Sequence, residues 1–240
     1  MDYFSSFPSS GLGKSFFNIS FAYMKPKEIK AIIFDLDGTL TTSSISWIRI
    51  CEALGVSFAE QDKLYQKTKK GEITLTAAKR KLIEMYRATG LATQEHFIKM
   101  VQSLEYRDYA KEVLSYLQGK GYILSIISGS LDLFVESSAQ YFGIKDLYSM
   151  THFKWDHNGE FAGMDYELNQ EQKKVEFMDY FLNKHKLSRE QCAVVADGDN
   201  DIELFKACGY AILIGQEIPE KVKEAVDKHI KSLLELKMIF

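Results

Sequence analysis

The segment AIIFDLDGTL, from Ala31 to Leu40, constrains the fold of this chain more than any other stretch. Its first four residues form a continuous apolar run, which is typical of a parallel strand buried on both faces. Asp35 and Asp37 follow where such a strand would leave the sheet, and open α/β sheets bind ligands beyond the carboxyl ends of their strands. Two carboxylates this close repel one another unless a positive group lies between them or one takes up a proton. The segment therefore predicts a ligand site, and the simpler alternative is a strand that ends in an Asp-Gly turn.

Strand-like and helical segments alternate along the rest of the chain. Apolar runs typical of buried strands lie at residues 122–127, 192–196 and 210–214, and amphipathic helices are indicated at 107–118 and 172–185. Residues 148–163 have the pattern of a hairpin with Asn158-Gly159 as its tight turn, and the tail after Gly215 has a helical pattern. This alternation predicts an α/β fold with a doubly wound, parallel, Rossmann-like sheet.

Residues 42–106 differ in character, because helical periodicity replaces the strand-like runs and several glycines divide the segment into short helices. A helical insertion directly after the first strand predicts a small cap over the carboxyl ends of the sheet. We therefore expect an N-terminal extension of unknown role at residues 1–24, a catalytic core formed by residues 25–41 and 107–240, and a helical cap at 42–106. Met24 is an alternative start of the natural chain.

The bulk composition argues against several classes of protein. A net charge of -3, without a basic patch that contains aromatic residues, gives no reason to expect a nucleic-acid partner. No apolar run approaches the roughly 18 residues that a membrane span needs, so no membrane partner is expected. Cys51, Cys192 and Cys208 fit neither a metal-binding spacing nor a disulfide framework, which favours a reducing cytoplasm.

Three of the predicted strands end in polar residues that the topology brings together. Asp35 and Asp37 follow the first strand, Ser128 follows the second, and Asp197 and Asp201 follow the third. Because the carboxyl ends of parallel strands meet at one edge of the sheet, we expect these side chains to share one site. Taken alone, Ser128 has a simpler interpretation as a helix N-cap.

These residues carry a resemblance to the haloacid dehalogenase-like hydrolase superfamily, and specifically to its phosphoserine-phosphatase-like branch. The first motif of that family matches residues 35–40, and the second matches Ser128-Gly129-Ser130. The fourth motif matches residues 197–201, which read DGDND. The third motif is a lysine at the start of the preceding helix, where Lys174 has the matching spacing and Lys173 is the alternative. The resemblance covers residues 28–234 and implies the α/β core with its inserted cap.

The resemblance implies hydrolysis of phosphate monoesters through an aspartyl-phosphate. Asp35 would be the nucleophile, and Asp37 would protonate the leaving alkoxide and then activate the attacking water. The implied cofactor is Mg²⁺, which prefers oxygen ligands. Its ligands would be Asp35, Asp197 and the backbone carbonyl of Asp37, with Asp201 acting from outside the inner ligand sphere. The residues expected to bind the phosphoryl group are Ser128, Gly129, Lys174 and Asn200.

The substrate is the least constrained part of this prediction. Phosphoserine is the expected substrate, and phosphoethanolamine, phosphocholine and other small phosphomonoesters are alternatives. In the phosphoserine-phosphatase-like branch a glutamate after the first motif binds the substrate ammonium group, and Ser44 stands at that position here. Arg80 is a candidate for the substrate carboxylate, because arginine suits bidentate carboxylate binding, although a solvated helix residue is an equal alternative. A phosphotransferase or mutase and a binding protein without turnover are the competing functions, and the intact acidic residues argue against the last.

Overall fold

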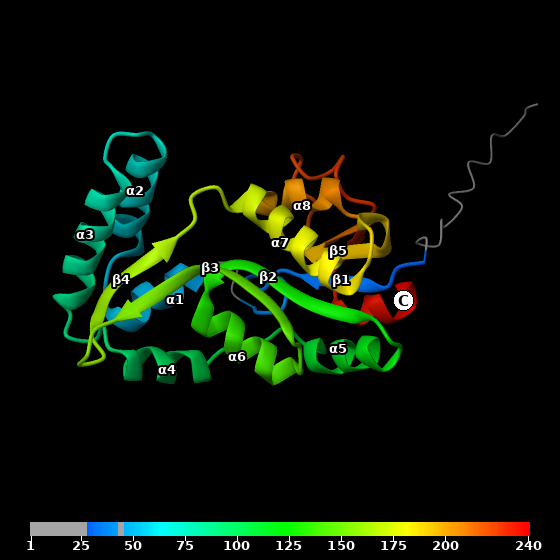
Figure 1. The fold of residues 1–240 in the computed structure, drawn as a ribbon, viewed down its shortest axis with the longest axis horizontal. Helices are drawn as coiled ribbons and strands as arrows, with labels where there is room; N and C mark the ends of the chain where they lie inside the picture. Colours follow the sequence, from blue (N-terminus) through cyan, green and yellow to red (C-terminus); the bar gives the residue numbers. More distant parts are fainter. Residues whose placement is uncertain (1–27, 43–45) are drawn as a thin grey trace, which may run out of the picture.

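The computed structural model describes residues 28–42 and 46–240, so the N-terminal extension and Ser44 lie outside the described part. Within that part, seven strands form one sheet in the order β4-β3-β2-β1-β5-β6-β7 (Figure 1). Neighbouring strands are parallel except β3 and β4, which are antiparallel. The strands are β1 (Ala31–Phe34), β2 (Ile123–Leu131), β3 (Asp146–Trp155), β4 (Phe161–Tyr166), β5 (Cys192–Ala196), β6 (Tyr210–Ile214) and β7 (Lys228–Ile230).

The central strand β1 is buried on both faces because helices cover both sides of the sheet. Ile32 and Phe34 pack on the side of α5 (Ala110–Gly119) and α6 (Asp132–Phe142). Ala31 and Ile33 pack on the opposite side, against α7 (Gln170–His185) and α8 (Ile202–Ala207). The two layers of helices lie above and below the sheet in Figure 1. The predicted doubly wound, Rossmann-like α/β fold is confirmed.

Four helices follow β1, and we call them the helical block: α1 (Ser46–Leu54), α2 (Phe58–Lys69), α3 (Leu75–Arg87) and α4 (Gln94–Gln102). The last three each begin after a capping hydroxyl, from Ser57, Thr74 and Thr93, which accepts a hydrogen bond from the first turn. The chain enters and leaves the block side by side, because Thr41 and Tyr106 form an antiparallel bridge. Two adjacent chain segments therefore connect the block to the rest of the protein near the carboxyl end of β1, which is the position predicted for the cap.

The β3–β4 hairpin, which was predicted around Asn158-Gly159, joins the sheet to the helical block. Arg87 at the end of α3 donates to the Phe161 carbonyl at 2.6 Å and to the Asp156 carboxylate at 2.8 Å. The rings of Tyr86 and Phe161 lie 5.3 Å apart between their centroids. The hairpin thus packs against α3 and fixes one side of the block over the sheet, where it is visible in Figure 1 beside α3.

Two predicted boundaries are wrong. The strand expected at residues 122–127 continues to Leu131, and its register against β3 shifts between Ser128 and Leu131, which is typical of a β-bulge. The tail is only partly helical, because β7 pairs with β6 and buries Ile230 before α9 (Leu236–Ile239) begins. A three-residue strand is too short to produce a recognisable period.

Single 3-10 turns complete the described chain at Arg189–Gln191, Asp199–Asp201 and Leu233–Glu235. Among the described residues, no helix has the length and apolar character that crossing a membrane requires.

Candidate active site

Asp35 lies at the carboxyl end of β1, in the middle of the sheet. Its backbone N–H donates to the Val195 carbonyl of β5 at 3.0 Å, and its side chain is buried. The chain then turns sharply, because the amides of Thr39 and Leu40 both donate to the Leu36 carbonyl. Gly38 adopts a positive φ of 72° in this turn, a conformation that favours glycine. The turn places Asp37 beside Asp35 at the same end of the strand.

Arg107, which lies where the chain leaves the helical block, contacts this turn. Its Nε and Nη2 donate to the Gly38 carbonyl oxygen at 2.8 and 2.5 Å. The sequence analysis missed this residue, because 69 positions separate the two partners and a single arginine carries no motif. Arg107 therefore fixes the backbone next to Asp37 and adds a positive charge near the acidic residues.

Asp37 contacts the first residue of the helical block. Its Oδ2 accepts a hydrogen bond from the Ser46 N–H, at the start of α1, at 3.2 Å. Burial, followed by the nearby charge of Asp35, raises the pKa of Asp37 from its ordinary value of 3.8 to about 6, and the contacts with Ser46 oppose this rise. A carboxyl group with such a pKa can exist in either protonation state near neutral pH.

Lys174 is buried beneath the acidic residues, and its ammonium joins two of them. Its Nζ lies 2.9 Å from Asp35 Oδ1 and 2.5 Å from Asp201 Oδ1, with the lysine side chain fully buried. Burial alone lowers the pKa of Lys174, but the charges of Asp201 and Asp35 outweigh it and raise the pKa above its ordinary value. Lys173 instead pairs with Glu176 at 2.8 Å near the surface. Of the two candidate lysines, the structure brings Lys174 to the site.

Asp197 and Asp201 complete an acidic cluster with Asp35. One carboxylate oxygen from each lies within 4.8 Å of the others. Burial raises the pKa of Asp197 to about 8, with further contributions from Asp35 and Asp201. Burial also raises the pKa of Asp201 to about 7, against the opposing charge of Lys174. The raised pKa values therefore reflect first the burial of these carboxyl groups and then their repulsion by neighbouring acids.

This cluster fits a divalent cation. The Oδ2 atom of Asp201 is buried and has no hydrogen-bond partner in the described part of the chain. Lys174 offers one positive charge to carboxylates that belong to Asp35, Asp37, Asp197 and Asp201. Oxygen donors with excess negative charge are the set that Mg²⁺ prefers. The donors present therefore suit the ion that the sequence analysis expected, and Asp35, Asp197 and Asp201 are the residues that could hold it.

Ser128 and Gly129 lie in the bulged part of β2, next to the acidic cluster. The Ser128 hydroxyl accepts from the Ser130 N–H at 3.3 Å, and the Gly129 carbonyl accepts from the Thr151 hydroxyl at 2.9 Å. The alternative of Ser128 as a helix N-cap is wrong, because α6 begins only after Leu131. Although Ser128 and Ser130 are buried, this short segment lines a cavity above Asp35.

Gln170, the first residue of α7, closes over Gly129. A Cβ atom at Gly129 would clash with the amide end of the Gln170 side chain, which would have to rotate away to make room for it. The sequence analysis did not include Gln170, because a single glutamine before a helix has no distinctive signal. Asn200 is exposed, and its side-chain oxygen lies over Gly198. Asp199 also lines the cavity above Asp35, and its carboxylate pairs with Lys221 at 3.3 Å.

A cavity of about 370 Å³, which we call the acidic cavity, opens above these residues. Its lining includes the predicted residues Asp35, Asp37, Ser128, Gly129, Asp197 and Asn200, together with Trp47 and Gln170. Lys174 and Asp201 lie buried beneath it. Arg80 is exposed on α3 and lines neither this cavity nor the one beside it. Ser44 falls outside the described residues.

Comparison with known proteins identifies the family of this chain. A family model described as a haloacid dehalogenase-like hydrolase matches residues 29–209. The chain belongs to this family. The prediction of that superfamily, in its phosphoserine-phosphatase-like branch, is confirmed, and so is the prediction of an enzyme.

Two curated relatives bear the name phosphoserine phosphatase. The protein from Methanocaldococcus jannaschii is 26% identical over 187 residues, which cover 78% of this chain and 85% of the relative. The protein from Archaeoglobus fulgidus is 23% identical over 205 residues, which cover 85% of this chain and 57% of the relative. A solved phosphoserine phosphatase, an analogue of its phospho-aspartyl intermediate, aligns with a TM-score of 0.68 and 24% identity over 89% of this chain and all of that one. At this identity the structural likeness shows a common fold.

Proposed function

We propose that this enzyme hydrolyses phosphate monoesters through a covalent phosphate on Asp35, with Mg²⁺ as cofactor. The observation that carries the proposal is the contact of buried Lys174 with Asp35, beside Asp37 with its pKa near 6. A binding protein has no need of a lysine buried among carboxylates, whereas phosphoryl transfer needs charge neutralised around an anionic group.

Asp35 is the proposed nucleophile. Its carboxylate is held in one orientation by Lys174 at 2.9 Å and faces the acidic cavity. Attack by a carboxylate oxygen on phosphorus breaks the bond to the substrate alcohol and forms an acyl phosphate, which water then cleaves. Ser128 and the backbone of Gly129 are proposed to hydrogen-bond the phosphoryl oxygens, because both lie on the bulge beside Asp35.

Asp37 is the proposed general acid and base. A group that titrates near the working pH can give a proton to the leaving alkoxide and later take one from water. The Ser46 N–H donor at 3.2 Å keeps the carboxyl group in place for both steps. When bound, Mg²⁺ would neutralise charge on the phosphoryl group, and the residues proposed to hold it are Asp35, Asp197, the Asp37 carbonyl and, less directly, Asp201.

The names of the curated relatives favour phosphoserine as the substrate. Arg80, the candidate for binding its carboxylate, does not support that choice, because Arg80 is exposed and outside both cavities, and Ser44 lies outside the described residues. We therefore propose the reaction class and leave phosphoserine as one substrate to be tested. A reducing cytoplasm belongs to the same proposal, and the free state of all three cysteines supports it.

The test is release of inorganic phosphate from a panel of phosphomonoesters with and without magnesium. Asp35→Asn should reduce the rate at least about 1,000-fold, since the nucleophile is lost. Asp165→Asn is the control, because Asp165 is exposed, pairs with Lys154 and lines neither cavity. Unchanged turnover in Asp35→Asn would show that the covalent mechanism is wrong. If the substrate alcohol is released only when an acceptor alcohol is added, and the phosphoryl group is recovered as an ester of that acceptor and not as inorganic phosphate, the enzyme is instead a phosphotransferase.

A further inference from the structure

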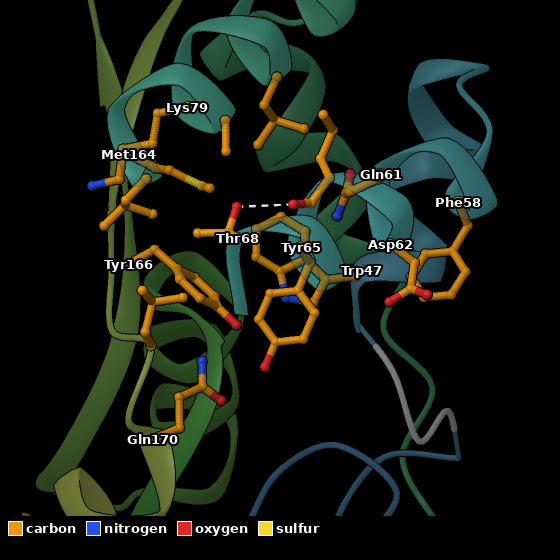
Figure 2. A pocket seen from close by; sticks show the side chains of 15 residues that line it. Trp47, Phe58, Gln61, Asp62, Tyr65, Thr68, Lys79, Met164, Tyr166 and Gln170 are labelled. Atoms are coloured by element: carbon orange, nitrogen blue, oxygen red, sulfur yellow. Dashed lines mark hydrogen bonds between the residues drawn. The ribbon is translucent and has the colours of Figure 1, made fainter. Parts of the chain in front are cut away.

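A second cavity, of about 280 Å³, lies between the helical block and β4, and we call it the apolar cavity (Figure 2). It adjoins the acidic cavity, because Trp47 and Gln170 line both. A further recess shares Tyr65, Thr68, Leu168 and Gln170 with it. In Figure 2, Gln170 lies at one end of the apolar cavity, beyond Tyr166. A ligand with its phosphate above Asp35 would therefore extend past Gln170 into the apolar cavity.

The walls of this cavity are mainly aromatic and aliphatic. The ring of Tyr166 lies 6.1 Å from those of Trp47 and Tyr65, at interplanar angles of 62° and 83°. Met164 of β4 and Ala78 of α3 contribute further apolar surface. Lys69 Nζ lies over one face of the Tyr65 ring, 5.4 Å from its centroid, so the apolar surface of the cavity comes mainly from Trp47, Tyr166 and the aliphatic side chains. The shape suits a compact apolar substituent.

Two of the polar residues in the lining have their hydrogen-bonding groups engaged within the protein. The side-chain oxygen of Gln61 accepts from the Tyr86 hydroxyl at 2.5 Å and from the Cys51 thiol at 3.2 Å. The Thr68 hydroxyl donates to the Leu64 carbonyl at 2.8 Å, as the dashed line in Figure 2 shows. These groups therefore offer little to a polar ligand.

The charged residues at the rim point elsewhere. Lys79 is the one basic residue in the lining, and Figure 2 shows its nitrogen turned away from Tyr65. Together with the larger effect of Lys154, the Lys79 charge lowers the pKa of Asp165, on the outer side of β4. Asp62 accepts a hydrogen bond from Gln66 at 3.2 Å on the exposed side of α2. Lys69 lines the adjoining recess and is not part of the lining of the apolar cavity. An amino-acid carboxylate placed inside the apolar cavity would therefore lie away from both lysine ammonium groups, and burying it there would be costly.

We propose that the natural substrate is the phosphate monoester of an alcohol that carries an apolar group of about the size of a ring. The inference rests on the proposed function and names its substrate class. The phosphate lies in the acidic cavity, the ester oxygen lies near Asp37, and the apolar group fills the space bounded by Trp47, Tyr65 and Tyr166. Removing that group from water provides binding energy that a serine side chain does not.

Three alkyl phosphates test this substrate class without large differences in leaving-group chemistry: 2-phenylethyl phosphate, ethyl phosphate and phosphoserine. With magnesium present, kcat/KM for 2-phenylethyl phosphate should exceed that for ethyl phosphate by at least about 10-fold, since a buried apolar group discriminates on this scale. Phosphoserine should be no better than ethyl phosphate. A kcat/KM for phosphoserine equal to or above that for 2-phenylethyl phosphate would overturn the inference.

A pair of variants on α3 tests the location. Ala78→Leu adds bulk inside the apolar cavity, whereas Ala77→Leu makes the same change one residue away, outside the lining. The ratio of kcat/KM for 2-phenylethyl phosphate to that for ethyl phosphate should fall about 10-fold in Ala78→Leu, mainly through KM. It should stay unchanged in Ala77→Leu. An unchanged ratio in a folded Ala78→Leu protein would place the substituent elsewhere and contradict the inference.

The outcomes separate this inference from the proposed function. If none of the three esters, nor the activated ester p-nitrophenyl phosphate, releases phosphate, the proposed function itself fails. If all are hydrolysed at similar rates, the function stands and the apolar substrate class is wrong. The comparison in the parent protein decides the inference even if Ala78→Leu does not fold.

Discussion

Replacing Asp197 by asparagine should stabilise the metal-free protein while it abolishes phosphate release. Burial, followed by the charges of Asp35 and Asp201, raises the pKa of Asp197 from 3.8 to about 8, and Lys174 and Arg107 only partly oppose this. Asparagine keeps the shape of the side chain and removes the charge. The same change removes a carboxylate proposed to bind Mg²⁺, so stability and activity should move in opposite directions.

The size of the gain follows from the pKa of Asp197. When folding raises the pKa of an acid, the contribution of that acid to stability is greatest below the pKa that it has in the unfolded state. This contribution is lost as the pH rises through the pKa that the acid has in the folded state. That interval runs from pH 3.8 to about 8. At about 1.4 kcal/mol per pKa unit it corresponds to at most about 6 kcal/mol, and partial exposure reduces the expected gain to about 3 kcal/mol near pH 8. For a chain of this length, that gain raises Tm by about 6–12 °C.

The assay is thermal unfolding in the presence of a chelator, near pH 8 and at about pH 5. At about pH 5 the carboxyl group of Asp197 should be protonated in the folded protein, so the stability gained by Asp197→Asn should fall to less than about half of its value near pH 8. Asp199→Asn is the control, because Asp199 is exposed and pairs with Lys221 at the surface. Its effect should stay within about 0.5 kcal/mol at both pH values. Magnesium should stabilise the parent protein and have little effect on Asp197→Asn. A gain that is absent near pH 8, or equal at both pH values, would refute the argument from crowded carboxylates.

Two further substitutions test contacts around the acidic cavity. Lys174→Met leaves two buried carboxylates without their counter-charge, so the free energy of unfolding in a urea titration should fall by about 3 kcal/mol. The matched change Lys173→Met, at the surface, should alter it by less than about 0.5 kcal/mol. Gly129→Ala would displace the flexible end of the Gln170 side chain beside the proposed phosphate site, so the inhibition constant for inorganic phosphate should rise, by less than about 10-fold. Gly119→Ala, which has open space around it, should leave that constant unchanged.

The centre of the fold was predictable because its signals are local. The run from Ala31 to Phe34 is apolar throughout, and every one of these residues is fully buried in the central strand. The acidic residues that follow could be placed together because parallel strands share one carboxyl edge. The same rule brought Asp197 within reach of Asp35, although 162 positions separate them (197 − 35).

The residues that were missed depend on contacts between distant segments. Arg107 acts on a carbonyl at Gly38, and Gln170 covers a glycine on β2, so neither has a pattern in its own neighbourhood. The course of β2 past Ser128 was also hidden, because a bulge interrupts the alternation that marks a strand. The choice between Lys173 and Lys174 needed the helix to be placed against the sheet, since adjacent residues on a helix face different directions.

The start of α1 links the two cavities. Its first residue, Ser46, donates its N–H to Asp37, and the next residue, Trp47, lines both the acidic and the apolar cavity. The N-terminus of a helix stabilises a nearby negative charge, so α1 favours the ionised form of the carboxyl group that is proposed to move the proton. A leaving group packed against Trp47 would bring its ester oxygen beside that carboxyl group. In the proposed mechanism, the first turn of α1 would therefore contact both the alcohol part of the substrate and the group that protonates it. A substrate that does not contact Trp47 should have a lower kcat as well as weaker binding.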